Sequence, residues 1–315
     1  MTEPTVEIVA DGLGFPEGPV ACSDGSVVVG EIRTGLVTRI GSDGTKTLVA
    51  DVGGGPNGLA VGPDGALYVC NDGGFAWTDF GDLQLPIGPG GVTQPDDYVT
   101  GSIQRVDLGT GEVTTLYTEC DGHRLSGPND CVFDTAGGMW FTDHGKVRAR
   151  DEDRGFVFYC QPDGSEIREV IGGFRQPNGI GLSPDGARLY VATTPDAHLY
   201  AWDITGTGQV ASASPFGHGG TLVGAAPPGA AFDSLAVEAG GNIAVATLLS
   251  GLGITVFNPD GHIVEHVPCP DPLPTNIVFG GVEGRNAWVT LSATGKLARL
   301  DWPRPGLALN FGNAF

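Results

Sequence analysis

Six related segments recur along this chain and constrain its fold more than any other feature. Each places an oxygen-bearing side chain directly after a Pro or a Phe, and the six residues are Glu17, Asn57, Asn129, Asn178, Asp233 and Thr275. A short apolar run follows each of them, then usually a Pro-Asp-Gly-like turn and a second apolar run. Successive positions lie 40, 72, 49, 55 and 42 residues apart. Repeats of about 40 to 50 residues that carry several short strands are typical of propeller blades.

We therefore predict one all-β domain over residues 1–315, a six-bladed β-propeller of four-stranded antiparallel blades. Residues 5–11 resemble the last strand of a repeat, such as residues 45–51, whereas the sixth repeat has no clear fourth strand. We expect residues 5–11 to complete the last blade, which closes the ring and removes two open sheet edges. The alternative is a β-sandwich or an open solenoid, which would need capping ends in place of complementary ones.

The interval of 72 residues contains an insertion, residues 73–100, between two strands of one blade. It is rich in Gly and Pro and carries the aromatic residues Phe75, Trp77, Phe80 and Tyr98. Long loops of this kind often bind ligands. One interpretation is a lid over the channel mouth that shapes an apolar pocket and places Trp77 against a substrate. The other is a packed surface excursion.

The charge balance excludes two classes of partner. Thirty-seven acidic residues against sixteen basic ones give a net charge of -21, which opposes approach to nucleic acid or to an anionic membrane surface. The acidity serves solubility, or else it gathers cations at an acidic mouth. The first 20 residues show no leader pattern and no stretch reaches about 18 apolar residues, so we expect a cytoplasmic protein.

The six cysteines show no Cys-x-x-Cys spacing. Four of them lie inside apolar β runs: Cys22, Cys70, Cys131 and Cys160. We predict buried free thiols, in preference to disulfides or a zinc site.

The six repeated polar residues are expected to meet at one mouth of the propeller channel, because the innermost strand of each blade lines that channel. Carboxylate and amide oxygens are hard ligands that suit Ca²⁺, Mg²⁺ or Mn²⁺. Burying a carboxylate at the mouth of an apolar strand costs free energy unless a positive charge pairs with it. Few basic residues lie near Glu17 or Asp233 in the sequence. A bound cation would supply that partner. The alternative, strongest for Asn57 and Thr275, is that these residues only satisfy backbone groups in turns.

Four segments carry a resemblance that covers nearly the whole chain. They are FPEGP (15–19), GPND followed by MWFTD (127–143), QPNGIGLSPDGARLYV (176–191) and FDSLAV (232–237). Together they resemble the SMP-30/gluconolactonase/luciferin-regenerating enzyme family, whose members are six-bladed propellers and mostly metal-dependent lactonases. The resemblance implies that Glu17, Asn178 and Asp233 hold one divalent ion, with Asn129 as a further ligand or a substrate contact. It also implies that Asp233 is the general base.

Two positions depart from the family pattern. The family often places an Arg close before the Asn-Asp pair, whereas here Arg124 lies five residues before Asn129. FTD is commonly followed by Pro, but here by His144. We expect Arg124 and Asn57 to contact the substrate. His144 is either an alternative base or proton shuttle, or a hydrogen-bonded histidine at a strand end.

The resemblance and the oxygen-rich ring together predict a metal-dependent hydrolase that opens a small-molecule lactone or ester. The ion, with Ca²⁺ expected first and Mn²⁺, Mg²⁺ or Zn²⁺ as alternatives, would polarise the lactone carbonyl, while Asp233 takes a proton from the attacking water. Two alternatives stay open: a diisopropylfluorophosphatase-like organophosphate hydrolase, and a non-catalytic ligand-binding propeller with a structural metal. The sequence contains no GxSxG, HExxH or P-loop motif, and it does not determine the substrate or the oligomeric state.

Overall fold

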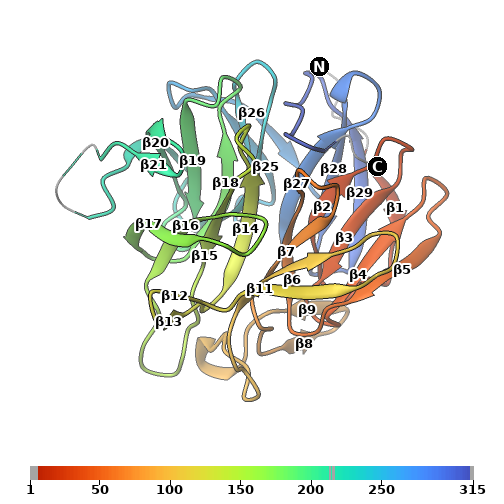
Figure 1. Ribbon diagram of the computed structural model, residues 1–315. Coiled ribbons are helices and arrows are strands. Elements are labelled where there is room, and N and C mark those ends of the chain that lie inside the picture. Colours follow the sequence, from red (N-terminus) through yellow and green to blue (C-terminus); the bar gives the residue numbers. More distant parts are fainter. Residues whose placement is uncertain (1–5, 213, 215–216, 313–315) are drawn as a thin grey trace.

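The repeats form six antiparallel sheets around a central channel in the computed structural model (Figure 1), which describes residues 6–212, 214 and 217–312. Each sheet is one blade, and the strand that carries the repeated polar residue lines the channel. The first blade contains β2 (Pro16–Ala21), β3 (Val27–Glu31), β4 (Leu36–Ile40) and β5 (Lys46–Asp51). The second contains β6 (Pro56–Val61), β7 (Leu67–Asn71), β10 (Ser102–Val106) and β11 (Val113–Tyr117). The third contains β14 (Pro128–Phe133), β15 (Met139–Asp143), β16 (Gly155–Cys160) and β17 (Ile167–Phe174).

The other three blades follow the same order. The fourth contains β18 (Pro177–Leu182), β19 (Arg188–Thr193), β20 (His198–Gly206) and β22 (Thr221–Ala225), with the short β21 (Gln209–Val210) beside β20. The fifth contains β23 (Ala230–Val237), β24 (Ile243–Leu249), β25 (Gly253–Phe257) and β26 (Ile263–Pro268). The sixth contains β27 (Pro274–Gly280), β28 (Asn286–Leu291), β29 (Lys296–Asp301) and β1 (Glu7–Ala10).

The predicted closure of the ring is confirmed. Strand β1 pairs antiparallel with β29, with Glu7 opposite Arg299, and an ion pair of 2.7 Å joins these two side chains. The N-terminal strand therefore covers an edge that the last repeat would leave open. Of the predicted range 5–11, residue 5 lies outside the described residues.

The Pro-Asp-Gly-like segments form one repeated turn between the first two strands of a blade. In four blades an Asp carboxylate accepts a hydrogen bond from the backbone N–H two residues later: Asp24 from Ser26, Asp64 from Ala66, Asp134 from Ala136 and Asp185 from Ala187, at 2.9–3.2 Å. Such side-chain turns are the local reason that these sequences end one strand and begin the next.

Apolar side chains fill the spaces between neighbouring blades. Among the described residues, the buried apolar side chains form six clusters, and each of them lies at an interface between two neighbouring blades. Between the second and third blades, for example, Tyr68 packs edge-on against Phe133 with ring centroids 5.0 Å apart. This packing of sheet on sheet leaves the channel available for polar groups. All six cysteines are free and buried, as predicted.

The insertion connects β7 to β10, two neighbouring strands of the second blade. It contains a small hairpin, β8 (Thr78–Phe80) and β9 (Leu83–Leu85), and a 3-10 turn, η1 (Pro89–Gly91). A second short hairpin, β12 (Glu119–Cys120) and β13 (His123–Arg124), lies outside the six blades. In Figure 1 the β8–β9 hairpin is at the lower end of the molecule, the end at which β2 and the other inner strands begin.

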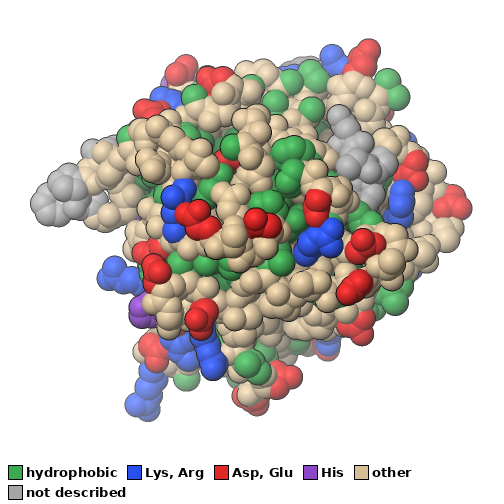
Figure 2. Space-filling view, in the orientation of Figure 1, with side chains coloured by type: hydrophobic (Ala, Val, Ile, Leu, Met, Phe, Trp, Pro, Cys, Tyr) green, Lys and Arg blue, Asp and Glu red, His purple; other side chains and the backbone are tan. Residues whose placement is uncertain are grey.

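Strands account for nearly all of the regular structure. Besides η1 there is one more 3-10 turn, η2 (Val282–Gly284), and no helix in the described ranges is long and apolar enough to cross a membrane. On the face in Figure 2, acidic side chains are spread widely with basic ones between them.

Candidate functional site

The six repeated residues lie in the first half of an inner strand, at the same end of the channel: five are the second residue of their strand, and Asp233 is the fourth of β23. In every inner strand the pairing register shifts at this point, for example between Glu17 and Val20 and between Pro177 and Ile180. Such a bulge re-aims side chains away from the alternation of a regular strand. The residues before two of the motif prolines, Phe15 and Gln176, adopt left-handed backbone angles (φ 58° and 48°). The repeat therefore builds a rim of irregular backbone where the chemistry is expected.

Five of the six ring residues are buried, and Asp233 alone is partly exposed. Glu17 accepts hydrogen bonds from the backbone N–H of Gly18 at 2.7 Å and from the side chain of Asn276 at 2.8 Å. The charge of Glu17 and the amide of Asn178 both act on the pKa of Asp233, so the three side chains lie near one another. The structure thus brings the two carboxylates and Asn178 into one group.

A second layer of residues lies one position further along each inner strand. In three blades this residue is glycine: Gly18, Gly58 and Gly179. A Cβ on Gly18 would stand 2.2 Å from the Asn57 carbonyl oxygen, and one on Gly58 would stand 2.5 Å from that of Asn129. The glycines therefore let neighbouring inner strands approach closely around the channel.

In the other three blades the second layer carries polar side chains, Asp130, Ser234 and Asn276, all of them buried. Asp130 accepts hydrogen bonds from the backbone N–H groups of Cys131 (2.9 Å) and Ile180 (3.4 Å). Sequence reasoning missed these three residues. The signal was present, because a polar side chain replaces the glycine of the repeat at each of them.

The carboxylates of the two layers have no basic partner. Burial raises the pKa of Glu17 above its ordinary value, and burial followed by the charge of Glu17 raises the pKa of Asp233 well above its own. The same two causes raise the pKa of Asp130 to about 7. No Lys or Arg of the described chain is among the groups that act on these three carboxyls. A cation would relieve both the desolvation and the mutual repulsion.

An unpartnered amide oxygen shows that the ring fits a metal ion. The Oδ1 atom of Asn129 is buried and accepts no hydrogen bond from any residue that the structure describes, although buried polar atoms almost always find a partner. Within the described residues no three His, Cys, Asp or Glu side chains are grouped closely enough to hold an ion by themselves. An ion at the mouth would therefore depend on amide oxygens, those of Asn129 and Asn178, in addition to Glu17 and Asp233. Such an oxygen-only set suits a hard divalent cation.

Asn57 is held by a partner that the sequence did not indicate. Its Nδ2 donates to Asp72 at 3.1 Å, and Asp72 in turn lies 3.5 Å from the ammonium of Lys146. Both charged side chains are almost completely buried. Lys146 follows the third blade's second strand and Asp72 follows that of the second blade, so no local spacing could have revealed the pair. The arrangement leaves the Asn57 Oδ1 as the free end of its amide.

His144 directly follows Asp143, which pairs with Pro128 at the start of β14, but it is a poor base. Its Nδ1 is 3.4 Å from the Gly145 carbonyl oxygen. Burial, followed by the charge of Lys146, lowers the pKa of His144 to about 4. The ring is therefore neutral at pH 7 with little affinity for a proton. Beside it, burial raises the pKa of Asp143 to about 6, and that carboxylate accepts three backbone N–H bonds from Ser126, Gly127 and Gly145.

Replacing His144 by Gln should change the pH dependence of stability. Between pH 6.5 and 4 the unfolded chain binds a proton on His144 that the folded chain does not, so the wild-type protein loses stability as the pH falls through this window. We expect the free energy of unfolding of the wild-type protein to fall by roughly 2–3 kcal/mol from pH 7 to pH 4 through this proton, and the His144→Gln variant to lack this decrease. Urea unfolding of both proteins at pH 7, 5.5 and 4 measures it. If the free energy of unfolding of the two proteins changes with pH in the same way, His144 titrates near its ordinary pKa.

Arg124 is not brought to the ring. It is exposed on the outlying β12–β13 hairpin, where its Nη1 donates to the Val99 carbonyl at 3.2 Å. Trp77 does approach the ring, because its ring packs edge-on against Phe15, two residues before Glu17, with centroids 5.2 Å apart. The Arg33 guanidinium also lies 5.4 Å from the Trp77 ring.

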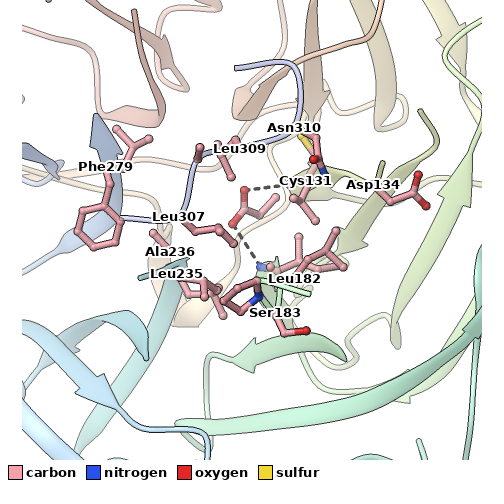
Figure 3. Close-up of a pocket in the computed structure, with 18 of the residues that line it drawn as sticks. Cys131, Asp134, Leu182, Ser183, Leu235, Ala236, Phe279, Leu307, Leu309 and Asn310 are labelled. Atoms are coloured by element: carbon pink, nitrogen blue, oxygen red, sulfur yellow. Dashed lines mark hydrogen bonds between the residues drawn. The ribbon is translucent and has the colours of Figure 1, made fainter. Parts of the chain in front are cut away.

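The opposite end of the channel holds a cavity of about 200 Å³. Figure 3 shows Leu307 and Leu309 of the C-terminal segment lining it together with Leu182 and Leu235, with Leu307 beside Leu235. The lining is largely apolar and also includes Asp130 and Asn276, which form the floor of the ring described above. The C-terminal segment is fixed there by a hydrogen bond of 2.9 Å from the Leu307 N–H to the Val237 carbonyl. This cavity lies behind the ring and contains none of its six residues.

A family comparison agrees with the ring geometry. Residues 15–293 match the model of the SMP-30/gluconolactonase/LRE-like region. The chain belongs to this family. Among curated SMP-30/gluconolactonase/LRE-like relatives, a diisopropyl-fluorophosphatase from Loligo vulgaris is 30% identical over 200 residues, 60% of this chain and 61% of that protein. A gluconolactonase from Zymomonas mobilis is 25% identical over 226 residues, 64% of this chain and 56% of that protein.

These matches cover less than two thirds of the relatives' own length. A solved structure of a calcium-binding protein, regucalcin, from Agrobacterium tumefaciens superposes with a TM-score of 0.72 at 17% identity, covering 97% of this chain and 98% of that chain. At that identity the superposition establishes the six-bladed fold alone.

Proposed function

We propose that this protein is a divalent-metal-dependent lactonase whose site is the ring at the Glu17 end of the channel. One observation carries the proposal: Glu17 and Asp233 are brought together without a basic partner, beside an Asn129 oxygen without any partner. The gluconolactonase name of one relative indicates lactones as the substrate class, and the calcium-binding name of the regucalcin structure supports Ca²⁺ as the first ion to test.

Glu17, Asn129, Asn178 and Asp233 would hold the ion. When bound, it would polarise the lactone carbonyl and stabilise the negative charge that develops on the carbonyl oxygen. Glu17 is positioned for the ligand role, because the Asn276 amide and the Gly18 N–H both donate to one oxygen of its carboxylate, Oε2. Asn178 is oriented by two hydrogen bonds: its Nδ2 donates to Thr194 at 3.1 Å, and its Oδ1 accepts from the Ser234 hydroxyl at 3.4 Å. The second lone pair of this Oδ1 would be the ligand to the ion.

Asp233 is suited to proton transfer because it alone in the ring is partly exposed. Its carboxylate accepts a proton from the water that adds to the lactone carbonyl. The same proton then passes to the ring oxygen when the C–O bond breaks, which regenerates the carboxylate and releases a hydroxy acid. His144 is not needed for this step, since its low pKa makes it a weak base.

Metal removal tests this proposal. Protein treated with a chelator and desalted should open no lactone, and added Ca²⁺, Mn²⁺ or Mg²⁺ should restore turnover. The assay would follow acid release from δ-gluconolactone and from lactones with an apolar substituent, because Phe75 and Trp77 of the insertion favour a less polar substrate. Full activity of the metal-free protein would contradict the proposal.

Organophosphate hydrolysis is the second candidate, because the relative with 30% identity is named a diisopropyl-fluorophosphatase. Rates on lactones and on a fluorophosphate, measured side by side with the same metal-loaded protein, separate the two activities. Metal binding without turnover of either substrate class would favour a non-catalytic propeller. The six free, buried thiols are consistent with a reducing compartment, and we infer a cytoplasmic location from them.

A further inference from the structure

Lys146 is the most deeply buried charged group near the site that the proposed mechanism does not use. Its side chain is fully inaccessible to solvent. The ammonium donates to the Gly74 carbonyl oxygen at 2.7 Å, lies 3.5 Å from Asp72 Oδ1, and faces the rings of Phe75 and Tyr98 at 4.2 and 5.5 Å from their centroids. All four partners belong to residues 72–98. A lysine of the third blade is thus enclosed by the insertion of the second blade.

The insertion spans the rim of the channel, and Lys146 lies where it begins. At the first blade Asp79 forms an ion pair with Arg33. At the sixth blade the Gln84 N–H donates to the Ala293 carbonyl at 2.8 Å. Next to Lys146, the backbones of Thr93 and Val147 are joined by a hydrogen bond of 2.9 Å. The Arg33–Asp79 ion pair is largely exposed. The Trp77–Phe15 ring contact and the hydrogen bonds of Gln84 involve no charged group. The Lys146 ammonium, in contrast, combines a buried charge, a hydrogen bond and two aromatic faces.

The same ammonium is coupled to the ring through Asp72. Asp72 Oδ1 accepts the Gly74 N–H at 2.6 Å, and its Oδ2 accepts the Asn57 Nδ2 at 3.1 Å. The first residues of the insertion and the amide of a ring residue therefore share one carboxylate. A carboxylate this deeply buried needs a nearby cation to remain ionised. Lys146 is that cation for Asp72.

We propose that Lys146 is a positioning residue for the substrate: it locks residues 73–100 over the Glu17 end of the channel and, through Asp72, fixes the Asn57 amide in the wall of the site. This inference rests on the proposed function, because it takes the substrate to be a lactone. The closed segment places Trp77 and Phe75 as an apolar wall beside Phe15. Because Lys146 itself is enclosed, it contributes through this segment and not by contact with the lactone.

Replacing Lys146 by Met tests the lock, since Met keeps most of the apolar stem and removes the charge. We expect the KM for an apolar lactone to rise about 10-fold or more with kcat within about threefold, the pattern of lost substrate binding. The dissociation constant of Ca²⁺ should stay within about threefold. Hydrogen exchange of residues 73–100 in the Ca²⁺-loaded protein should become about 10-fold faster or more. The matched control is Lys46→Met, which removes an ammonium bonded to the Asp11 carbonyl on the first blade's outer strand.

A double variant separates two effects of replacing Lys146: the loss of its contacts with residues 73–100, and the unpaired charge that remains on Asp72. Lys146→Met alone leaves Asp72 without a counter-charge, so we expect a lower melting temperature. Lys146→Met combined with Asp72→Asn removes both charges and should restore most of the lost melting temperature. We expect the double variant to keep the raised KM and the fast exchange of residues 73–100. Wild-type KM and wild-type exchange in the double variant would overturn the proposal. If the wild-type protein binds Ca²⁺ but opens no lactone, the proposed function fails, and the exchange experiment alone then supports or overturns the lock.

Discussion

Replacing Asp233 by Asn is expected to reduce kcat/KM for lactone opening by about 10³-fold or more. The variant keeps the shape of the side chain but cannot accept the proton of the attacking water, and general-base catalysis commonly contributes about 10²–10⁴-fold. It also weakens one of four ligands. The measurement is steady-state hydrolysis at saturating Ca²⁺, so that reduced metal affinity does not by itself account for the loss.

The control for this variant is Asp185→Asn. Asp185 is an exposed turn residue at the opposite end of the channel that accepts the Ala187 N–H, a contact that Asn can also make. Its activity should match that of the wild-type protein. An Asp233→Asn variant that retains more than about a tenth of wild-type activity would show that another group takes the proton.

Replacing Glu17 by Gln is expected to raise the dissociation constant of Ca²⁺ by about 100-fold or more, because it removes one of only two ring carboxylates, and lesser changes around metal ligands already cost 10–100-fold. Without metal the opposite effect is expected on stability. Glu17 is buried and its charge has no basic partner, so the neutral Gln should leave the metal-free protein as stable as the wild type or more so. Calorimetric titration gives the affinity, and melting curves with and without Ca²⁺ give the stability.

The matched control is Glu31→Gln, a buried carboxylate of the same blade that bonds Gly14 and Thr38 away from the ring. It should bind Ca²⁺ with wild-type affinity within about threefold. If Glu17→Gln binds Ca²⁺ as tightly as Glu31→Gln does, Glu17 is not a ligand.

The fold was largely predictable because its determinants are local and repeated. Turn residues such as Asp64 and Asp185 act on their own neighbours, and their recurrence fixes the number of blades. The closure of the ring by β1 followed from two incomplete repeats that complement each other. Placement of Glu17 and Asp233 at one mouth followed from the same periodicity.

The parts of the site that were missed depend on contacts between blades. Asp130 and Asn276 interrupt the glycine pattern of the second layer, a signal that becomes meaningful only when Gly18 and Gly58 are known to touch the next strand. The Asp72–Lys146 pair joins residues 74 positions apart, and no spacing rule connects them. The substrate contact of Arg124 stays a prediction. Its short distance from Asn129 in the sequence does not by itself bring it to the ring, since it lies on a separate hairpin and donates to the Val99 carbonyl.

The central claim is that the ring at the Glu17 end of the channel binds the ion on which catalysis depends. Anomalous diffraction from crystals grown with Mn²⁺ or Ca²⁺ tests it most directly. We expect one strong peak at this mouth, with oxygens of Glu17, Asn129, Asn178 and Asp233 at metal–ligand distance, roughly 2.3–2.6 Å for calcium. A protein whose only ion lies elsewhere, while it still opens lactones in a metal-dependent way, would contradict the account.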